Sequence, residues 1–194
     1  INIFWFFSTY IFNRISGNGA FVTVLINITS LSSGIVAIYF QKFKRLQVYH
    51  YSLVANVFGM FGIASGILIQ HPALTIVSLV VFIFSFGTGN GSIKMVYLSE
   101  ILPPAGIGAA SATQWVTSAL QSLAVPYLME VIGISGIFYT CTLFIIIHIY
   151  LLKKLGIETL GKNKDQIEAD FLGVKPKRRS YKSISLSMIG AQKP

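Results

Sequence analysis

The sequence predicts an all-α membrane protein with six transmembrane helices. Of its 194 residues, 54% are hydrophobic and only 11% are charged, whereas about 25% are charged in a typical soluble domain. The mean hydropathy is +0.70. Lys, Arg, Asp and Glu are absent from four long runs, namely 15–41, 46–93, 101–129 and 131–152. Because a helix needs about 20 apolar residues to cross the bilayer core, these runs hold one, two, one and one crossings, and the apolar N-terminal residues provide another.

Turn-forming residues divide the bundle, which we expect to occupy 1–154. Ser16-Gly17-Asn18-Gly19, Gln70-His71-Pro72 and Pro103-Pro104 are typical of helix ends. The expected spans are 1–14, 20–40, 48–69, 73–98, 107–129 and 133–152. The segment 155–171 is charged and predicts a cytoplasmic helix, and 172–194 predicts a basic, disordered tail. Since the first residues are already apolar, we expect that the chain enters in the middle of a helix.

The distribution of charge predicts the orientation in the membrane. The net charge is +9, and the part of the chain from Lys153 onward contains ten Lys or Arg and four acids. A second basic loop, 42–45, is separated from this tail by four spans and so lies on the same side. Basic residues favour the cytoplasmic side. We therefore expect a multi-pass protein, placed in the plasma membrane with its C-terminus in the cytoplasm, that contacts lipid and does not bind nucleic acid.

Several polar residues interrupt the apolar spans. Asn90 and Lys94 are four residues apart and share a helix face. A lysine in lipid faces a wet cavity or a partner, unless it extends to the interface. Gln114 and Trp115 lie near the middle of a span, which indicates an interior-facing, hydrogen-bonding pair. Asn27 belongs to a stripe of small and hydroxyl residues that fits either helix packing or a pore lining.

Signatures of catalysis are missing from the sequence. It has no metal-ligand spacing, no phosphate-binding loop and no Gly-x-Ser-x-Gly motif. We therefore expect no enzyme activity, no metal and no cofactor.

Four motifs resemble the C-terminal half, spans seven to twelve, of sugar porters of the major facilitator superfamily. The first residues, 1–9, look like the seventh span of that family, S-G-I-N-A-I-F-Y-Y-S-T. The stretch 89–100 is similar to G-P-G-P-I-P-W-x-x-x-x-E of the tenth span, with Glu100 on the glutamate. Gln114-Trp115 matches the Q-W or N-W pair of the eleventh span. Residues 157–168 are similar to the closing P-E-T-K-G-K-T-L-E-E-I-E.

The resemblance implies a function. Members of this family move hexoses or related polyols by alternating access, as facilitators or proton symporters, and their two six-span halves rock around a central site. The partner of this chain would then be an N-terminal six-span half. The implied substrate-binding residues are Asn2, Asn27, Asn90, Lys94, Met95, Gln114, Trp115 and the aromatic pair Phe6-Phe7. The implied gating charges are Glu100, Glu158, Arg45 and Lys42.

Departures from the family pattern leave alternatives open. The loop motif D-R-x-G-R-R is replaced by 41–45, which lacks the acid and the glycine, and both arginines that normally follow Glu100 are missing. Met95 stands where the family has tryptophan. One alternative is a non-transporting sugar sensor or degenerate paralogue that signals through its tail. Another is a porter for an anionic solute drawn by Lys94.

Overall fold

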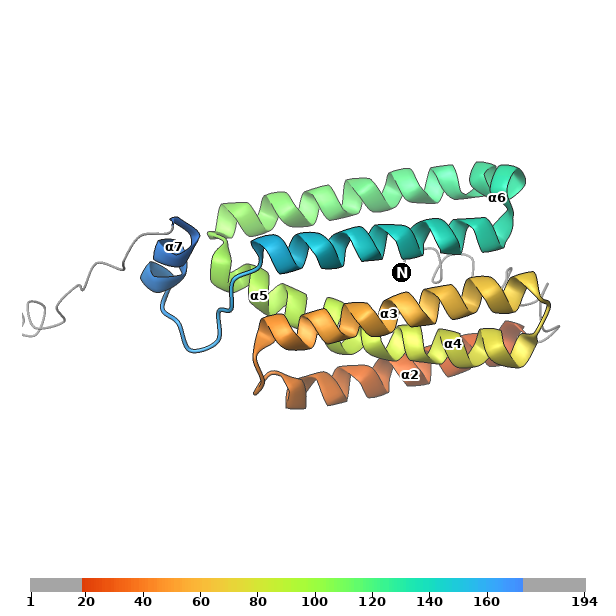
Figure 1. Ribbon diagram of the computed structural model, residues 1–194, viewed down its shortest axis with the longest axis horizontal. Coiled ribbons are helices and arrows are strands. Elements are labelled where there is room, and N and C mark those ends of the chain that lie inside the picture. Colours follow the sequence, from red (N-terminus) through yellow and green to blue (C-terminus); the bar gives the residue numbers. More distant parts are fainter. Residues whose placement is uncertain (1–18, 173–194) are drawn as a thin grey trace, which may run out of the picture. The chain divides into compact units, whose positions relative to one another are not determined.

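The computed structural model describes residues 19–172, and every regular element in that range is a helix (Figure 1). The elements in order are α2 (Gly19–Phe40), α3 (Arg45–Leu68), α4 (Pro72–Ser85), the π-helix η1 (Phe86–Ile93), α5 (Lys94–Ile101), α6 (Pro104–Leu155) and α7 (Lys164–Leu172). The expected first span, 1–14, and the expected tail lie outside the described residues, apart from the first residue of that tail, which ends α7.

Four helical stretches of the described part are long and apolar enough to cross a membrane. They are Gly19–Phe40, Arg45–Leu68, Pro72–Ile101 and Pro104–Leu155. The third stretch comprises α4, η1 and α5 together. The protein is therefore a multi-pass membrane protein with an all-α fold.

The fourth stretch, α6, is interrupted at Gly133. Its 52 residues are more than twice the length that one crossing needs. Gly133 has φ 69° and ψ 171°, a backbone conformation that a residue without Cβ adopts readily. Figure 1 shows two arms of α6 that run in opposite directions from this turn. We call 104–132 the first arm and 134–155 the second arm, and they correspond to the spans expected at 107–129 and 133–152.

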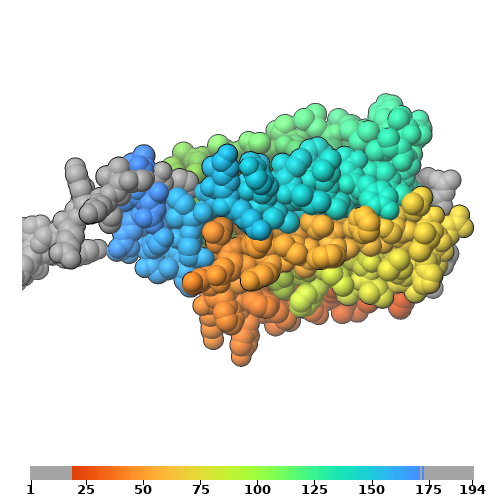
Figure 2. Space-filling model, viewed as in Figure 1, coloured from red at the N-terminus to blue at the C-terminus, as the bar shows by residue number. Residues whose placement is uncertain are grey.

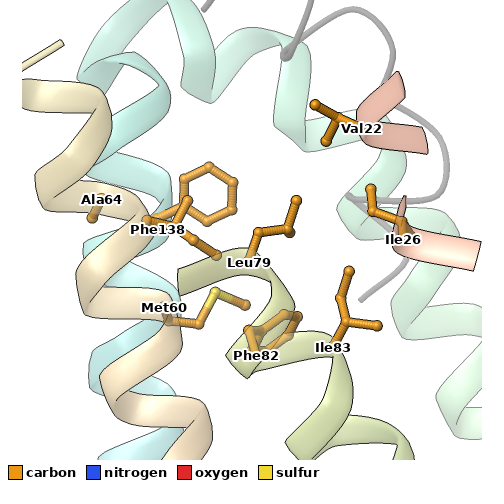
Figure 3. Packing of buried hydrophobic residues seen from close by; sticks show 9 residues of the cluster. Val22, Ile26, Met60, Ala64, Leu79, Phe82, Ile83 and Phe138 are labelled. Carbon is orange, nitrogen blue, oxygen red and sulfur yellow. The ribbon is translucent and has the colours of Figure 1, made fainter. Parts of the chain in front are cut away.

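The apolar core joins α2, α3, α4 and the second arm. Figure 3 shows the side chains of this cluster converging from these elements. Its fully or nearly fully buried members are Val22, Ile26, Met60, Ile63, Ala64, Leu79, Phe82, Ile83 and Phe138. Glycine allows α3 and α4 to approach each other closely, because a Cβ on Gly59 would lie 2.7 Å from Cβ and 2.9 Å from the backbone nitrogen of Phe82. Small residues of this kind are typical of helix interfaces in membranes.

Buried polar side chains bond across the helix interfaces. Asn56 of α3 is only 1% exposed, and its Oδ1 accepts a hydrogen bond of 2.6 Å from the hydroxyl of Ser85 at the end of α4. The hydroxyls of Ser65 on α3 and Tyr139 on the second arm are 3.1 Å apart. Pairing is required here because lipid offers no alternative partner to a buried polar atom.

The two arms of α6 differ in how much of their surface is covered. The second arm packs against α3, and the two lie side by side on the face shown in Figure 2. The first arm keeps large apolar side chains exposed, among them Leu120, Leu123 and Tyr127. An apolar exterior is expected where a helix meets lipid or another part of a membrane protein.

A second compact unit begins at Gly161. Its helix, α7, is shorter than the helical segment expected over 155–171, since 156–163 are not helical. Glu158 explains part of this difference, because its Oε1 accepts hydrogen bonds from the backbone N–H groups of Thr159 and Leu160 and holds them in a turn. Within the second unit, Lys162 Nζ lies 2.8 Å from Asp170 Oδ2.

Candidate solute site and charge cluster

The π-helix η1 shapes the middle of Pro72–Ile101, which we call the third crossing because it is the third membrane-spanning stretch of the described residues. Three glycines, Gly87, Gly89 and Gly91, fall in its eight residues. A Cβ on Gly87 or on Gly89 would overlap the side chain of Ser33 on α2 or of Ser52 on α3, respectively, so these glycines allow η1 to press against both helices. The backbone N–H of Lys94 bonds to the carbonyl of Gly89, five residues earlier, which widens the turn. Single π turns within α-helices occur frequently at functional sites.

A hydrogen-bonded chain of three side chains connects η1 to α3 and the second arm. The hydroxyl of Tyr49 donates to Oδ1 of Asn90 at 3.2 Å, and the same oxygen lies 3.2 Å from Nε2 of His148. The two rings meet edge to face, with centroids 5.6 Å apart. We call Asn90, Tyr49 and His148 the polar chain. Because the Tyr49 proton goes to Asn90, the hydroxyl oxygen accepts from His148 when Nε2 carries its hydrogen.

Lys94 reaches from the first residue of α5 to the first arm. Its Nζ donates a 3.0 Å hydrogen bond to Oε1 of Gln114. The Lys94 side chain is partly buried. A lysine and a glutamine from different crossings therefore meet at an exposed position, four residues along the chain from Asn90 of the polar chain.

The other predicted binding residues are placed differently. Trp115 is 68% exposed and Met95 is 49% exposed, so both side chains are available to a partner or a ligand. Asn27 is exposed, and its Nδ2 donates to the carbonyl of Thr23 on its own helix at 3.0 Å, apart from the Lys94–Gln114 pair. Asn2, Phe6 and Phe7 lie outside the described residues.

Sequence reasoning did not identify Tyr49. An aromatic residue in an apolar run has the composition of an ordinary core residue, and the partner that distinguishes it is distant in sequence. His148 carried a signal, since an ionisable residue inside a crossing usually faces the protein interior. Only the fold shows that Tyr49 connects this histidine to Asn90.

A charge cluster made of Arg45, Glu100 and Glu158 connects three elements at one end of the bundle. Arg45 forms an ion pair with Glu100 at the end of α5. Glu158, just after the second arm, accepts hydrogen bonds from the backbone N–H groups of Arg45 at 3.1 Å and Leu46 at 3.2 Å. These are the first residues of α3, which has no capping side chain of its own. A carboxylate at a helix N-terminus satisfies free N–H groups and favours the helix dipole.

Lys42 is not part of the charge cluster. Its Nζ lies 5.2 Å from the centroid of the Tyr39 ring, as in a cation–π contact. The cluster forms around Arg45 although the family's loop acid and the arginines after Glu100 are missing. Two buried atoms in it, Nε of Arg45 and Oε2 of Glu100, have no hydrogen-bond partner among the described residues.

One open groove lies beside the charge cluster, since Leu46 contributes to both. It has a volume of about 230 Å³ and is lined by Leu46, Gln47, His50, Tyr51, Leu152 and Lys153. It runs between the start of α3 and the end of the second arm. Within residues 19–172, no group of three or more His, Cys, Asp or Glu is placed to hold a metal ion.

Comparison with known proteins identifies relatives of this chain. Residues 1–171 match the family model described as sugar (and other) transporter. The chain is 34% identical over 103 residues to sugar transporter ERD6-like 8 of Arabidopsis thaliana, covering 50% of this chain and 22% of the relative. It is 27% identical over 198 residues to facilitated glucose transporter protein 1 of Caenorhabditis elegans, covering 88% of this chain and 37% of the relative.

Two solved structures have the same fold. A double tryptophan mutant of XylE superposes with a TM-score of 0.77 at 22% identity, over 88% of this chain and 39% of that one. The proton:xylose symporter XylE of the major facilitator superfamily, bound to 6-bromo-6-deoxy-D-glucose, superposes with a TM-score of 0.72 at 21% identity and the same coverage. The chain thus has the helical fold of part of a major facilitator protein.

Proposed function

Because this chain belongs to the sugar (and other) transporter family, we propose that it is the C-terminal half of a carrier that moves a hexose or related polyol across a membrane. The chain spans 37% of the length of its worm relative. The proposal therefore includes an N-terminal six-span half. It also places the carrier in the plasma membrane with the C-terminus in the cytoplasm, on the basis of the positive charge in 42–45 and in the tail.

The meeting of Lys94 with Gln114, beside the polar chain, is the observation that carries this proposal. Sugar hydroxyls need donors and acceptors, and amide side chains offer both. In the proposed site, Asn2, Asn90 and Gln114 bond the hydroxyls, and Trp115 stacks on the apolar face of the ring. Met95 and the pair Phe6-Phe7 would complete its apolar walls. Asn27 is a weaker candidate, since its amide bonds to its own helix.

The charge cluster suits a role in alternating access. It ties the start of α3 to the ends of α5 and the second arm, so this end of the bundle can move as one body. When the gate closes, the exposed parts of the Arg45 and Glu100 side chains, 17% and 28% of their surface, would contact the other half. In this proposal the cluster breaks its contacts with the N-terminal half each time the carrier opens to the cytoplasm. Transport as a facilitator or as a proton symporter is compatible with this arrangement.

Uptake by the full-length protein tests the proposal. Cells lacking their own hexose carriers would express it, and uptake of a panel of labelled hexoses, polyols and sugar acids would be measured against cells carrying the empty vector. We expect saturable uptake of at least one of these sugars. Uptake that does not saturate for any sugar, from protein present at the cell surface, would refute the transport proposal. Sugar binding retained under those conditions would favour a sensor.

A further inference from the structure

We propose that the solute bound at Lys94 is a sugar that carries a carboxylate, a sugar acid rather than a neutral hexose. This inference rests on the proposed transport function and specifies its substrate class. Three properties of the residues around Lys94 support it. Lys94 has no acidic partner among the described residues, the groups around it offer more hydrogen-bond donors than acceptors, and its ammonium carries one positive charge.

Lys94 has no acidic partner among the described residues. Glu100 is the acid nearest to it in the chain, six residues further on, and it is engaged by Arg45 in the charge cluster. The other ion pair within 19–172 is Lys162–Asp170, in the second unit. Gln114, the hydrogen-bond partner of Lys94, is neutral. A cation inside an apolar crossing is costly without an anion or water, so an anion that arrives with the solute would be bound favourably.

The neighbouring groups offer more donors than acceptors. Lys94 uses one of its three N–H bonds on Oε1 of Gln114, which leaves two. That bond uses one of the two lone pairs on the carbonyl oxygen of Gln114, and the NH₂ group can donate two hydrogen bonds. In the same way, Tyr49 donates to Oδ1 of Asn90 and leaves the NH₂ of Asn90 available. Asn90 precedes Lys94 by about one turn, so these donors lie on the same side of the third crossing.

A carboxylate is the ligand that fits this set of donors. An ionised carboxylate only accepts hydrogen bonds, whereas each sugar hydroxyl must also donate one. One ammonium matches a single negative charge, while a phosphate would bring nearly two. The remaining hydroxyls of a sugar acid would still bond to the amides. A carboxylated sugar therefore satisfies both the charge of Lys94 and the direction of the hydrogen bonds.

The test compares D-glucuronate with D-glucose, which differ only at the sixth carbon, as substrates of the full-length protein. We expect that the wild-type carrier takes up glucuronate with a half-saturation concentration at least about tenfold below that for glucose, because a site built for a bonding group rejects the analogue that lacks it. The variant Lys94→Met should lose at least about tenfold in glucuronate affinity and should change the glucose affinity little. Lys153→Met, which removes the same charge from the last turn of α6, is the matched control and should keep the preference.

Several results would overturn the inference. Wild-type carrier that takes up glucose as well as or better than glucuronate would contradict it. An equal loss of affinity for glucuronate and for glucose in Lys94→Met would also contradict it, because Lys94 would then pair with an acid of the protein and not with the carboxylate of the solute. If the variant does not reach the surface, competition by unlabelled glucuronate against glucose uptake in the wild type decides alone. Failure of the wild type to take up any sugar, charged or neutral, would instead refute the transport function and with it this inference.

Discussion

Arg45 connects two of the acids that the sequence analysis named as gating charges. Its guanidinium pairs with Glu100, while its own N–H and that of Leu46 bond to the carboxylate of Glu158. The side chains of Arg45 and Glu100 are only 17% and 28% exposed. An ion pair this shielded is screened less by solvent than a surface pair. The cluster therefore acts as a structural clamp, by which we mean that it holds the start of α3 to the end of α5 and to the segment after the second arm.

We expect Glu100→Gln to weaken this clamp. The change removes the charge but keeps the shape, so Arg45 is left with a neutral partner, and a hydrogen bond to a charged group contributes about 2 kcal/mol. The midpoint of thermal unfolding in detergent should fall, and the ratio of inward to outward accessibility should shift. The double exchange Arg45→Glu with Glu100→Arg should recover part of the loss. Wild-type stability and uptake in the single variant would show that the pair has no structural role.

A second prediction at this scale concerns Trp115. We expect Trp115→Ala to raise the half-saturation concentration for the transported sugar about tenfold, because the indole face would no longer pack on the ring. Folding should be unaffected, since the side chain is 68% exposed. Val116, also exposed on the first arm, provides the control Val116→Ala, which should behave like the wild type. Equal uptake by the two variants and the wild type would remove Trp115 from the solute pathway.

At the scale of elements, the crossings could be predicted and their internal irregularities could not. Four charge-free runs predict helices because the bilayer leaves no other way to satisfy the backbone. The glycines at 87, 89 and 91 predict a weak point in the third crossing, but a kink and a π turn have the same local sequence. The choice depends on Ser33 and Ser52 of two other helices, against which the glycines pack.

For the candidate solute site, the polar residues could be predicted from the sequence, but their pairing could not. Lys94, Asn90 and Gln114 are conspicuous because polar residues are rare in such spans, and composition alone identifies them. Their pairing is not visible in composition, since Gln114 lies on the next crossing. Tyr49 and Glu158 depend still more on the fold. Tyr49 bonds to His148, which is 99 residues away in the sequence. Glu158 bonds to Arg45, which is 113 residues away.

Packing of α3 against α4 provides a prediction at this scale. Gly59→Ala should lower the stability of the bundle by about 1–3 kcal/mol, because the new methyl group would meet the backbone of Phe82 and push the two helices apart. Gly34→Ala is the matched control, since nothing lies within 4 Å of a Cβ at that position. It should leave stability unchanged or raise it by about 0.5–1 kcal/mol through the loss of backbone entropy in the unfolded chain. Thermal unfolding of both variants in one detergent measures the difference. Similar midpoints for the two would contradict the close packing.

For the whole molecule, we expect transport to require both halves of the carrier. The Lys94–Gln114 hydrogen bond is exposed, and so are Trp115 and other large apolar side chains of the first arm. Expression of this chain alone should give no uptake, whereas co-expression with a separate N-terminal half should restore it. Labelled sugar uptake and co-purification of the two halves measure these outcomes. Saturable uptake by the chain alone would show that the second half is dispensable.

The turn at Gly133 also has a consequence for how the protein is made. The two arms of α6 form a helical hairpin, and among Asp, Glu, Lys and Arg only Glu130 lies between 101 and 152, three residues before the turn. Lys153 and Lys154 lie in the last turn of the second arm. In the orientation proposed above, the hairpin tip crosses the bilayer with one acidic group and the basic residues stay in the cytoplasm, as the positive-inside rule favours. Glu130→Lys would place a positive charge on the translocated end of the hairpin, and we expect it to delay or invert insertion of the last two crossings during biosynthesis.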